Sequence, residues 1–228
     1  MLRAPSSPTA PPESHGYTLV RQPSASRLRK QDHILSQAEA LFARDGFEGT
    51  SLEAIGNASG FSRHNLLYYY PNKEALYQAV LDSVLDDWLG RMTDLSADGE
   101  PVQQIREYIR VKFVFARTRP CASQLFTKEM MAGAPFGSAA VRERIAPLLA
   151  ANVQAFEAWA QQGLIARVNF THLMFTIWAV TQGYVDQQTQ FALLLQQPTL
   201  SDADYTQAET LLLQMLGAVL RIDLLAQP

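Results

Sequence analysis

The chain has 228 residues, 47% of them hydrophobic, a formal net charge of −3 and a pI near 5.8. These values allow one or two buried cores and exclude a polycation, so any contact with nucleic acid must come from a local basic face. The single cysteine, Cys121, excludes an intramolecular disulfide framework, and no run of about 18 apolar residues predicts a membrane span. Because the N-terminal segment also lacks an apolar signal region, we expect a cytoplasmic protein with no membrane partner.

The first 26 residues are rich in Pro, Ser and Ala, and we expect a disordered tail over residues 1–26. Between Glu13 and Asp32 there are basic residues but no acidic one. We interpret Arg21 as a solvated residue of the tail. For the three basic residues just before the first predicted helix, an arm near DNA phosphates and a solvated segment fit the pattern equally well: Arg27, Arg29 and Lys30.

The segment QDHILSQAEALFARDGF predicts an amphipathic helix, because its apolar residues recur at helical spacing and Gly46 can end it. The segment TSLE that follows has the pattern of a capping box. In it, Thr50 accepts from the backbone N–H of Glu53, and Glu53 reaches back to the N–H of Thr50. We therefore expect a short helix to begin here.

A second short helix is predicted after the break at Ser59–Gly60, with Ser62 as its N-cap. It has to stop near Tyr70, because Pro71 disfavours helical geometry in the residue before it. Two short helices joined by a glycine turn, after a longer amphipathic one, predict a helix-turn-helix within residues 27–75.

This second short helix contains three consecutive tyrosines, which cannot all face one core because each residue turns the helix by about 100°. With Leu66 inward, Tyr70 is inward too, and Tyr68 and Tyr69 are left for the surface or for packing against neighbouring helices. No acidic residue occurs from Ser62 to Asn72. Arginine can pair with guanine, asparagine with adenine and leucine with a thymine methyl, while hydroxyls and lysine suit phosphates. The candidate DNA-binding residues here are Ser62, Arg63, His64, Asn65, Leu67, Tyr68, Tyr69 and Lys73.

The remainder of the chain keeps a helical pattern, without the sustained alternation that is typical of strands. Proline and glycine breaks divide it into helices expected over residues 73–92, 102–118, 121–132, 138–163, 171–190 and 203–225. The sequence thus predicts an all-α protein. A small three-helix domain with the candidate DNA-binding residues would precede a larger helical domain over residues 76–228.

The stretch GFEGTSLEAIGNASGFSRHNLLYYYPNKEALYQAVL resembles the DNA-binding domain of TetR-family transcriptional repressors. The resemblance implies that the domain over residues 76–228 binds a ligand and dimerises, and hence that a homodimer binds a palindromic double-stranded operator. It also adds Thr50 to the DNA-contacting positions. Gly56 replaces the usual alanine, which costs helix propensity but should leave the fold intact. Leu67 stands where many members have tyrosine, and Tyr68 can partly replace that contact.

Later segments resemble a narrower group, the TetR-type regulators of pyrimidine utilisation, which sense uracil and related bases. The matching segments, in order, are NLLYYYPNKEALY, VLDDWL, IREYIRVKF, LFTKEMMAGAP and FTIWAVTQGYVD. A flat ring with alternating N–H and C=O groups requires aromatic or apolar faces and amide-type partners. Trp178 and Gln182 lie four residues apart on one helical face and can supply both.

Trp88 matches a further pocket position of that group, on the helix leading out of the DNA-binding domain. Lys112, Phe113 and Tyr184 are weaker candidates for ligand contacts. Core packing is the alternative for each tryptophan, and a hydrogen bond across a dimer interface is the alternative for the glutamine. We expect no cofactor and no metal, because His172 has no second ligand at i+4 and the chain has no cysteine cluster.

The last predicted helix, AETLLLQMLGAVLRIDLL, is apolar on more than one face. With the helix at 171–190 it can form a four-helix dimer interface, or it can be buried within a monomer. Two other function classes remain open: an enzyme, which no nucleophile–base pair or phosphate loop supports, and an architectural DNA-binding protein without an effector. A TetR-type regulator of an unrelated hydrophobic ligand or metabolite is the third alternative.

Overall fold

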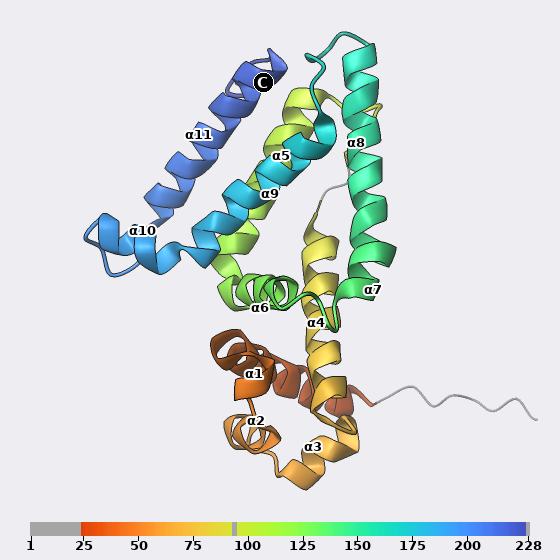
Figure 1. Ribbon diagram of the computed structural model, residues 1–228, viewed down its shortest axis with the longest axis vertical. Helices are drawn as coiled ribbons and strands as arrows, with labels where there is room; N and C mark the ends of the chain where they lie inside the picture. Colours follow the sequence, from red (N-terminus) through yellow and green to blue (C-terminus); the bar gives the residue numbers. More distant parts are fainter. Residues whose placement is uncertain (1–23, 93–94, 227–228) are drawn as a thin grey trace, which may run out of the picture.

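The computed structural model describes residues 24–92 and 95–226, and all regular secondary structure within these ranges is helical. A small N-terminal domain lies below a larger bundle of helices, and the long helix α4 runs from one into the other (Figure 1). Most of the predicted tail lies outside the described residues. Its last residues are ordered, because Ser24 caps the first helix and residues 25 and 26 are already helical.

The N-terminal domain consists of α1 (Ala25–Gly49), α2 (Leu52–Ser59) and α3 (Arg63–Tyr69). Gly46 interrupts α1 with φ 75°, as predicted from its position after the amphipathic run. The predicted capping box is wrong by one residue, because Ser51 rather than Thr50 caps α2 and accepts from the N–H of Ala54. The three helices enclose a core that includes Ile34, Phe42, Ile55 and Leu66.

The turn between α2 and α3 is tight at two glycines. Gly60 has φ 73°, a conformation that residues with a Cβ adopt only with strain. A Cβ at Gly56 would lie 2.6 Å from the carbonyl oxygen of Phe61, which is too close for an undisturbed backbone. The glycine at position 56 therefore allows the turn before α3 to come close to α2.

The larger domain places its helices around a second core, which includes Tyr108, Phe113, Phe156 and Trp159. Among the described residues, no helix is long and apolar enough to cross a membrane. The helices are α4 (Lys73–Arg91), α5 (Pro101–Thr118), α6 (Pro120–Met131), α7 (Ser138–Ala140), α8 (Ala146–Gln161), α9 (Phe170–Asp186), α10 (Gln188–Leu194) and α11 (Asp202–Leu220), with the π-helical turn η1 (Val141–Ile145) before α8.

Three predicted helices differ from those observed. The helix predicted over 138–163 contains the π-helical turn η1, and the one predicted over 171–190 ends at Asp186 before α10 begins. The last helix ends at Leu220 rather than near residue 225, because Arg221 adopts the left-handed conformation with φ 57°. None of these differences alters the all-helical fold class.

Candidate DNA-binding face and ligand cavity

Helix α3 exposes the side chains that the helical wheel places outward. Leu66 is fully buried and Tyr70 is 8% exposed, whereas Tyr68 is 69% exposed. Ser62 caps the helix by accepting from the backbone N–H of Asn65. The inward Tyr70 and the outward Tyr68 are therefore confirmed, whereas Tyr69 is half-buried and packs against the core of the domain. The exposed residues of the face are Ser62, Arg63, His64, Asn65, Leu67 and Tyr68.

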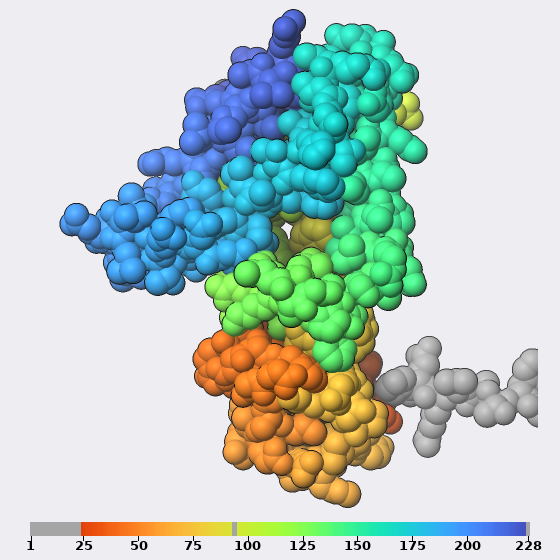
Figure 2. All heavy atoms as spheres, viewed as in Figure 1, coloured from red at the N-terminus to blue at the C-terminus, as the bar shows by residue number. Residues whose placement is uncertain are grey.

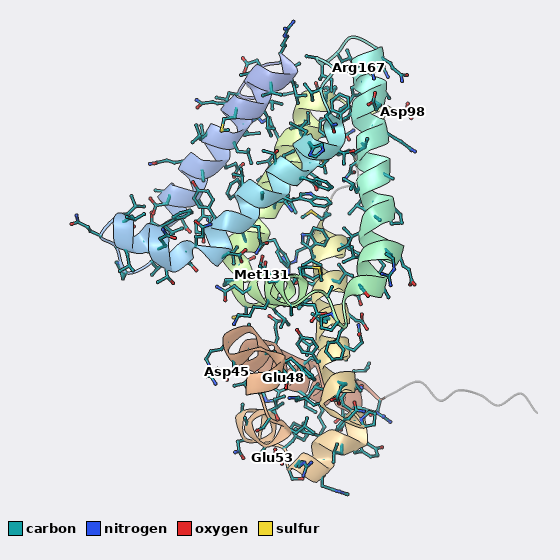
Figure 3. The ribbon with its side chains drawn as sticks, viewed as in Figure 1. Asp45, Glu48, Glu53, Asp98, Met131 and Arg167 are labelled. Atoms are coloured by element: carbon teal, nitrogen blue, oxygen red, sulfur yellow. The ribbon has the colours of Figure 1, made fainter. Side chains whose placement is uncertain are left out.

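The face is not free of acidic groups, although α3 itself carries none. Glu53 of α2, labelled in Figure 3, forms an ion pair with Arg63, at 3.2 Å between Oε1 and Nε. Both side chains are well exposed, so the pair contributes little to stability and leaves Arg63 able to exchange partners. The sequence did not indicate this pair, because the two residues lie on different helices.

The first turn of α1 lies beside the outward tyrosines. The guanidinium of Arg27 lies 5.3 Å from the ring centroid of Tyr68 and 5.8 Å from that of Tyr69. The two tyrosine rings meet edge to face at 5.2 Å. Arg27, which the structure places inside α1, thus lies beside the surface of α3.

Two residues predicted to contact phosphates have other partners in this structure. Thr50 is only 2% exposed, and its hydroxyl donates to the carbonyl oxygens of Gly46 at 2.8 Å and Leu41 at 3.3 Å. The Nζ of Lys73 donates to the carbonyl oxygen of Phe47 at 2.9 Å and lies 4.2 Å from the ring centroid of Phe47. Thr50 is therefore buried and bonded to α1, and Lys73 connects α4 to the end of α1. Their contacts with phosphates stay predictions.

A cavity of about 480 Å³ lies between α4, α5, α6 and α9. Figure 2 shows the surface hollowed above α6 and beside α9. Four of the predicted ligand-binding residues line it together: Trp88, Lys112, Trp178 and Gln182. Apolar side chains form most of the remaining wall, including Val84, Leu85, Phe115, Phe126, Met130 and Ile145.

Two weaker candidates lie in the core next to the cavity rather than on its wall. Phe113 is 2% exposed and packs edge to face on Tyr184, with ring centroids 5.7 Å apart. Tyr184 also packs on Phe191 and Tyr205. Neither residue lines the cavity, and a ligand contact by either of them stays a prediction. On α5 the wall is formed by Lys112, Phe115 and Ala116, the i, i+3 and i+4 positions of one helical face, which excludes position 113.

The amide of Gln182 already has two partners. Its Oε1 accepts from the Ser123 hydroxyl at 2.9 Å, and its Nε2 donates to the Asp186 carboxylate at 2.9 Å. Ser123 belongs to α6, so Gln182 connects α9 to that helix. Sequence spacing did not indicate Ser123 as a wall residue, because the contact joins residues 59 positions apart.

Three aromatic rings surround Lys112 in the cavity wall. Its Nζ lies 5.3 Å from the ring centroid of Trp88, 5.7 Å from that of Trp178 and 5.9 Å from that of Tyr108. Burial lowers the pKa of Lys112 to about 7. Burial also raises the pKa of Tyr108 to about 12, and the tyrosine oxygen accepts from Nε1 of Trp178 at 2.7 Å. The hydrogen bond between Trp178 and Tyr108 therefore holds two of the three rings together. The pKa of the lysine between the rings is close to neutral pH.

Helix α6, which lines the cavity, also holds the DNA-binding domain. The Nζ of Lys128 donates to the carbonyl oxygens of Ala43 and of Arg44, the latter at 2.9 Å, near the end of the first part of α1. Such a contact suits the negative end of a helix dipole. Helix α6 therefore contacts the cavity through Thr127 and Met130 and contacts α1 through Lys128.

A buried carboxylate provides a second connection between α6 and α4. Glu129 is 2% exposed and accepts from the Tyr77 hydroxyl at 3.1 Å and from the backbone N–H groups of Phe136 and Gly137 at 2.6 and 2.7 Å. Burial and this carboxylate raise the pKa of the Tyr77 hydroxyl, so it stays a neutral donor. Tyr77 itself packs against Phe42 of α1, with ring centroids 4.8 Å apart.

Arg119, between α5 and α6, completes the connection. It bonds Asp87 on α4 and Glu39 on α1, the latter at 2.8 Å from Nη2 to Oε2. Burial raises the pKa of Glu39, and the charge of Arg119 opposes that change. Asp87, which bonds Arg119, immediately precedes the cavity residue Trp88 in the chain. One turn of α4 therefore contacts both the cavity and the arginine that bonds α1.

The described residues contain no group of three or more His, Cys, Asp or Glu side chains that could hold a metal ion. Two family models match most of the chain. Residues 34–80 match bacterial regulatory proteins of the tetR family, and residues 81–223 match the C-terminal region of YcdC-like proteins.

Similar proteins include the HTH-type transcriptional regulator RutR of Escherichia coli K12. It is 43% identical over 157 residues, which cover 69% of this chain and 74% of RutR. The HTH-type transcriptional repressor NicS of Pseudomonas putida is 31% identical over 93 residues, covering 40% of this chain and 43% of NicS. These relatives are transcriptional regulators and not enzymes.

Solved structures share the fold at lower identity. The ketosteroid transcriptional regulator KstR2 of Mycobacterium tuberculosis superposes with a TM-score of 0.68 at 17% identity, over 84% of this chain and 95% of that one. AibR, solved with isovaleryl coenzyme A and operator DNA, gives a TM-score of 0.66 at 21% identity, over 84% and 98%. At these identities the similarity establishes the fold alone.

Proposed function

The chain belongs to the TetR family of bacterial transcriptional regulators, and from that premise we propose that it is a cytoplasmic homodimeric repressor released from a palindromic operator by a pyrimidine such as uracil or thymine. The observation that carries the proposal is the cavity. It combines two tryptophan faces and an amide with helices that also hold α1.

The DNA half of the proposal is supported by the exposure of α3. In it, Arg63 pairs with a guanine edge, Asn65 with an adenine and Leu67 with a thymine methyl, while His64 faces the groove beside them. The hydroxyls of Ser62, Tyr68 and Tyr69 suit phosphates. Release of Arg63 from Glu53 costs little because that ion pair is exposed.

The dimer is supported by an apolar stripe on α11. Leu211, Met215 and Val219 follow one another at four-residue spacing and are 55, 50 and 48% exposed, and Phe175 of α9 is 45% exposed. Pairing α9 and α11 with the same helices of a second copy would cover these side chains. Two recognition helices would then face successive major grooves of a palindromic site.

The pyrimidine is supported by the chemistry of Trp88, Trp178 and Gln182 and by the 43% identity with RutR. A planar ring can lie against the indoles while its N–H and C=O edge exchanges hydrogen bonds with the amide. Because Gln182 is bonded to Ser123 of α6, a ligand that takes this amide also releases α6. Helix α6 then transmits the change to α1 through Lys128, and repression ends when the ligand prefers that state by a few kcal/mol.

Calorimetric titration of the purified protein with uracil and with thymine tests this function. We expect saturable binding that is lost in Trp178→Ala and in Gln182→Ala. Binding should persist in Gln161→Ala, a matched control, because this glutamine is exposed on α8 and lies outside the cavity wall. Absence of binding by the parent protein would overturn the pyrimidine as effector.

A second candidate has a specific observation in its favour. The wall of the cavity is mainly apolar, and its volume of about 480 Å³ suits ligands larger than a single pyrimidine ring. A TetR-type regulator of a hydrophobic metabolite would use the same helices. Thermal-shift screening with apolar metabolites distinguishes the two, because only this alternative predicts stabilisation that survives Gln182→Ala.

A further inference from the structure

Lys112 is the buried cation of the ligand cavity, and no partner is provided for its charge by the described residues. It is 9% exposed, and the only cause of its lowered pKa is burial, with no contribution from a nearby carboxylate. Buried ammonium groups are normally paired, because an isolated charge is costly in a low-dielectric site. The rings of Trp88, Tyr108 and Trp178 offer only partial compensation through their faces.

The acidic side chains on the surrounding helices have partners other than Lys112. The carboxylate of Asp87 on α4 bonds Arg91 and Arg119, and that of Asp186 on α9 bonds Gln182. Glu129 on α6 is occupied by Tyr77 and two backbone N–H groups. On α11, Glu209 lies near the positive charges of arginines on α5. On α5 itself, Tyr108 stays neutral because burial raises its pKa.

We propose that the cavity selects a planar ligand carrying one negative charge, that this charge pairs with Lys112, and that Lys112, wherever it is neutral in the free protein, takes up a proton from solvent when the ligand binds. The inference rests on the proposed function, because it assigns the chemical class of the effector in that same cavity. For a pyrimidine it specifies a ring that bears a carboxylate. The ring lies between Trp88 and Trp178, its edge reaches Gln182, and its carboxylate lies at Lys112.

The proton balance follows from the pKa of Lys112. Because burial lowers the pKa of Lys112 to about 7, the neutral amine and the ammonium form are both present in the free protein near pH 7. An anion beside it favours the ammonium form, so the neutral fraction takes up a proton from the buffer and the carboxylate stays ionised. A neutral ring, such as uracil, gives the lysine only a carbonyl oxygen and drives no such uptake.

Calorimetry with three probes tests the inference: uracil, uracil-6-carboxylate and benzoate, each in two buffers of different protonation enthalpy at pH 6 and pH 8.5. We expect uracil-6-carboxylate to bind at least about tenfold more tightly than uracil at pH 7. Its uptake should approach one proton at pH 8.5 and vanish at pH 6. Its affinity should fall about 30-fold between these pH values, as the fraction of protonated Lys112 falls.

The variant Lys112→Met keeps the aliphatic stem and removes the charge. It should abolish both the preference for the carboxylate and the proton uptake. Arg110→Met is the matched control, because it removes a positive charge from the same helix at an exposed position outside the cavity wall. That control should retain the preference. The proton count on the parent protein tests the inference even where a variant folds poorly.

The outcomes separate this inference from the proposed function. Uracil binding as tightly as its carboxylate, without proton uptake, would overturn the inference and leave a pyrimidine regulator standing. Benzoate binding with proton uptake, while neither pyrimidine binds, would support the anionic ligand and overturn the pyrimidine. Failure of all three probes to bind would overturn both.

Discussion

The recognition helix α3 and the cavity helix α9 both carry polar side chains of functional interest, but in different states. On α3, Asn65 and His64 project into solvent, and Arg63 has only an exposed ion pair. On α9, the polar groups of Trp178 and Gln182 are already bonded to Tyr108, Ser123 and Asp186. The proposed DNA-binding face is therefore preformed, whereas a ligand bound at Gln182 would have to exchange hydrogen bonds in the cavity. Under the proposed function, that exchange would connect the cavity to α6.

The largest effect on stability is expected when the buried charge of Lys112 is removed. Lys112→Met should raise the free energy of unfolding at pH 7 by on the order of 4 kcal/mol, because it removes a desolvated ammonium. The pKa is about 7 in the folded protein and near 10.5 when unfolded, so the lysine penalises folding fully below pH 7 and progressively less up to pH 10.5. Denaturant unfolding at pH 6.5 and pH 10 measures this, and an equal difference at both would contradict it.

The second largest effect on stability is expected at Glu129, which connects α6 to α4. Glu129→Ala leaves the N–H groups of Phe136 and Gly137 and the Tyr77 hydroxyl without their acceptor, and should cost about 3 kcal/mol of stability. Tyr77→Phe, which removes one of these bonds, should cost only about 1 kcal/mol. Chemical denaturation of both variants gives the comparison. A Glu129→Ala protein as stable as the parent would show that the carboxylate does not hold α6 to α4.

On the exposed face the effects should appear in DNA binding rather than in folding. Arg63→Ala should reduce discrimination at one operator base pair by about 2 kcal/mol and leave the melting temperature unchanged. Glu53→Ala frees the same arginine and serves as the matched variant, with discrimination retained. Binding measured on operators substituted one base pair at a time tests this. Unchanged preference in Arg63→Ala would mean that another side chain contacts that base.

Gly56→Ala separates helix propensity from the packing of the turn. Propensity alone predicts a gain of about 1 kcal/mol, whereas the approach of the Phe61 carbonyl oxygen to 2.6 Å predicts a net loss of about 1 kcal/mol. Thermal unfolding gives the sign. A stabilised variant would show that the turn opens easily.

The smallest effect concerns Lys73. Because its ammonium donates to the Phe47 carbonyl oxygen, Lys73→Ala should lower stability by less than about 1 kcal/mol and leave the salt dependence of DNA binding unchanged. If the lysine leaves Phe47 for a phosphate, the slope becomes shallower by about one unit instead. Affinities measured across a salt series distinguish the two roles.

The sequence by itself determined the features that depend on residues close together in the chain. The all-helical class follows from the 3.6-residue apolar spacing, and the burial of Leu66 and Tyr70 against the exposure of Tyr68 follows from the rotation of one short helix. The breaks at Gly46 and Gly60 follow from the need for positive φ. The presence of Trp178 and Gln182 on one wall also follows from their four-residue spacing.

Only the tertiary structure decided which partners these residues have. Thr50 and Ser51 are both good helix caps, and the burial of Thr50 against Leu41 and Gly46 determined which of them caps α2. Likewise, the contacts of Lys73 with Phe47 and of Gln182 with Ser123 join residues 26 and 59 positions apart. The physical reason is that local spacing determines the face on which a side chain lies, whereas its partner, burial and charge state depend on which distant helix packs against that face.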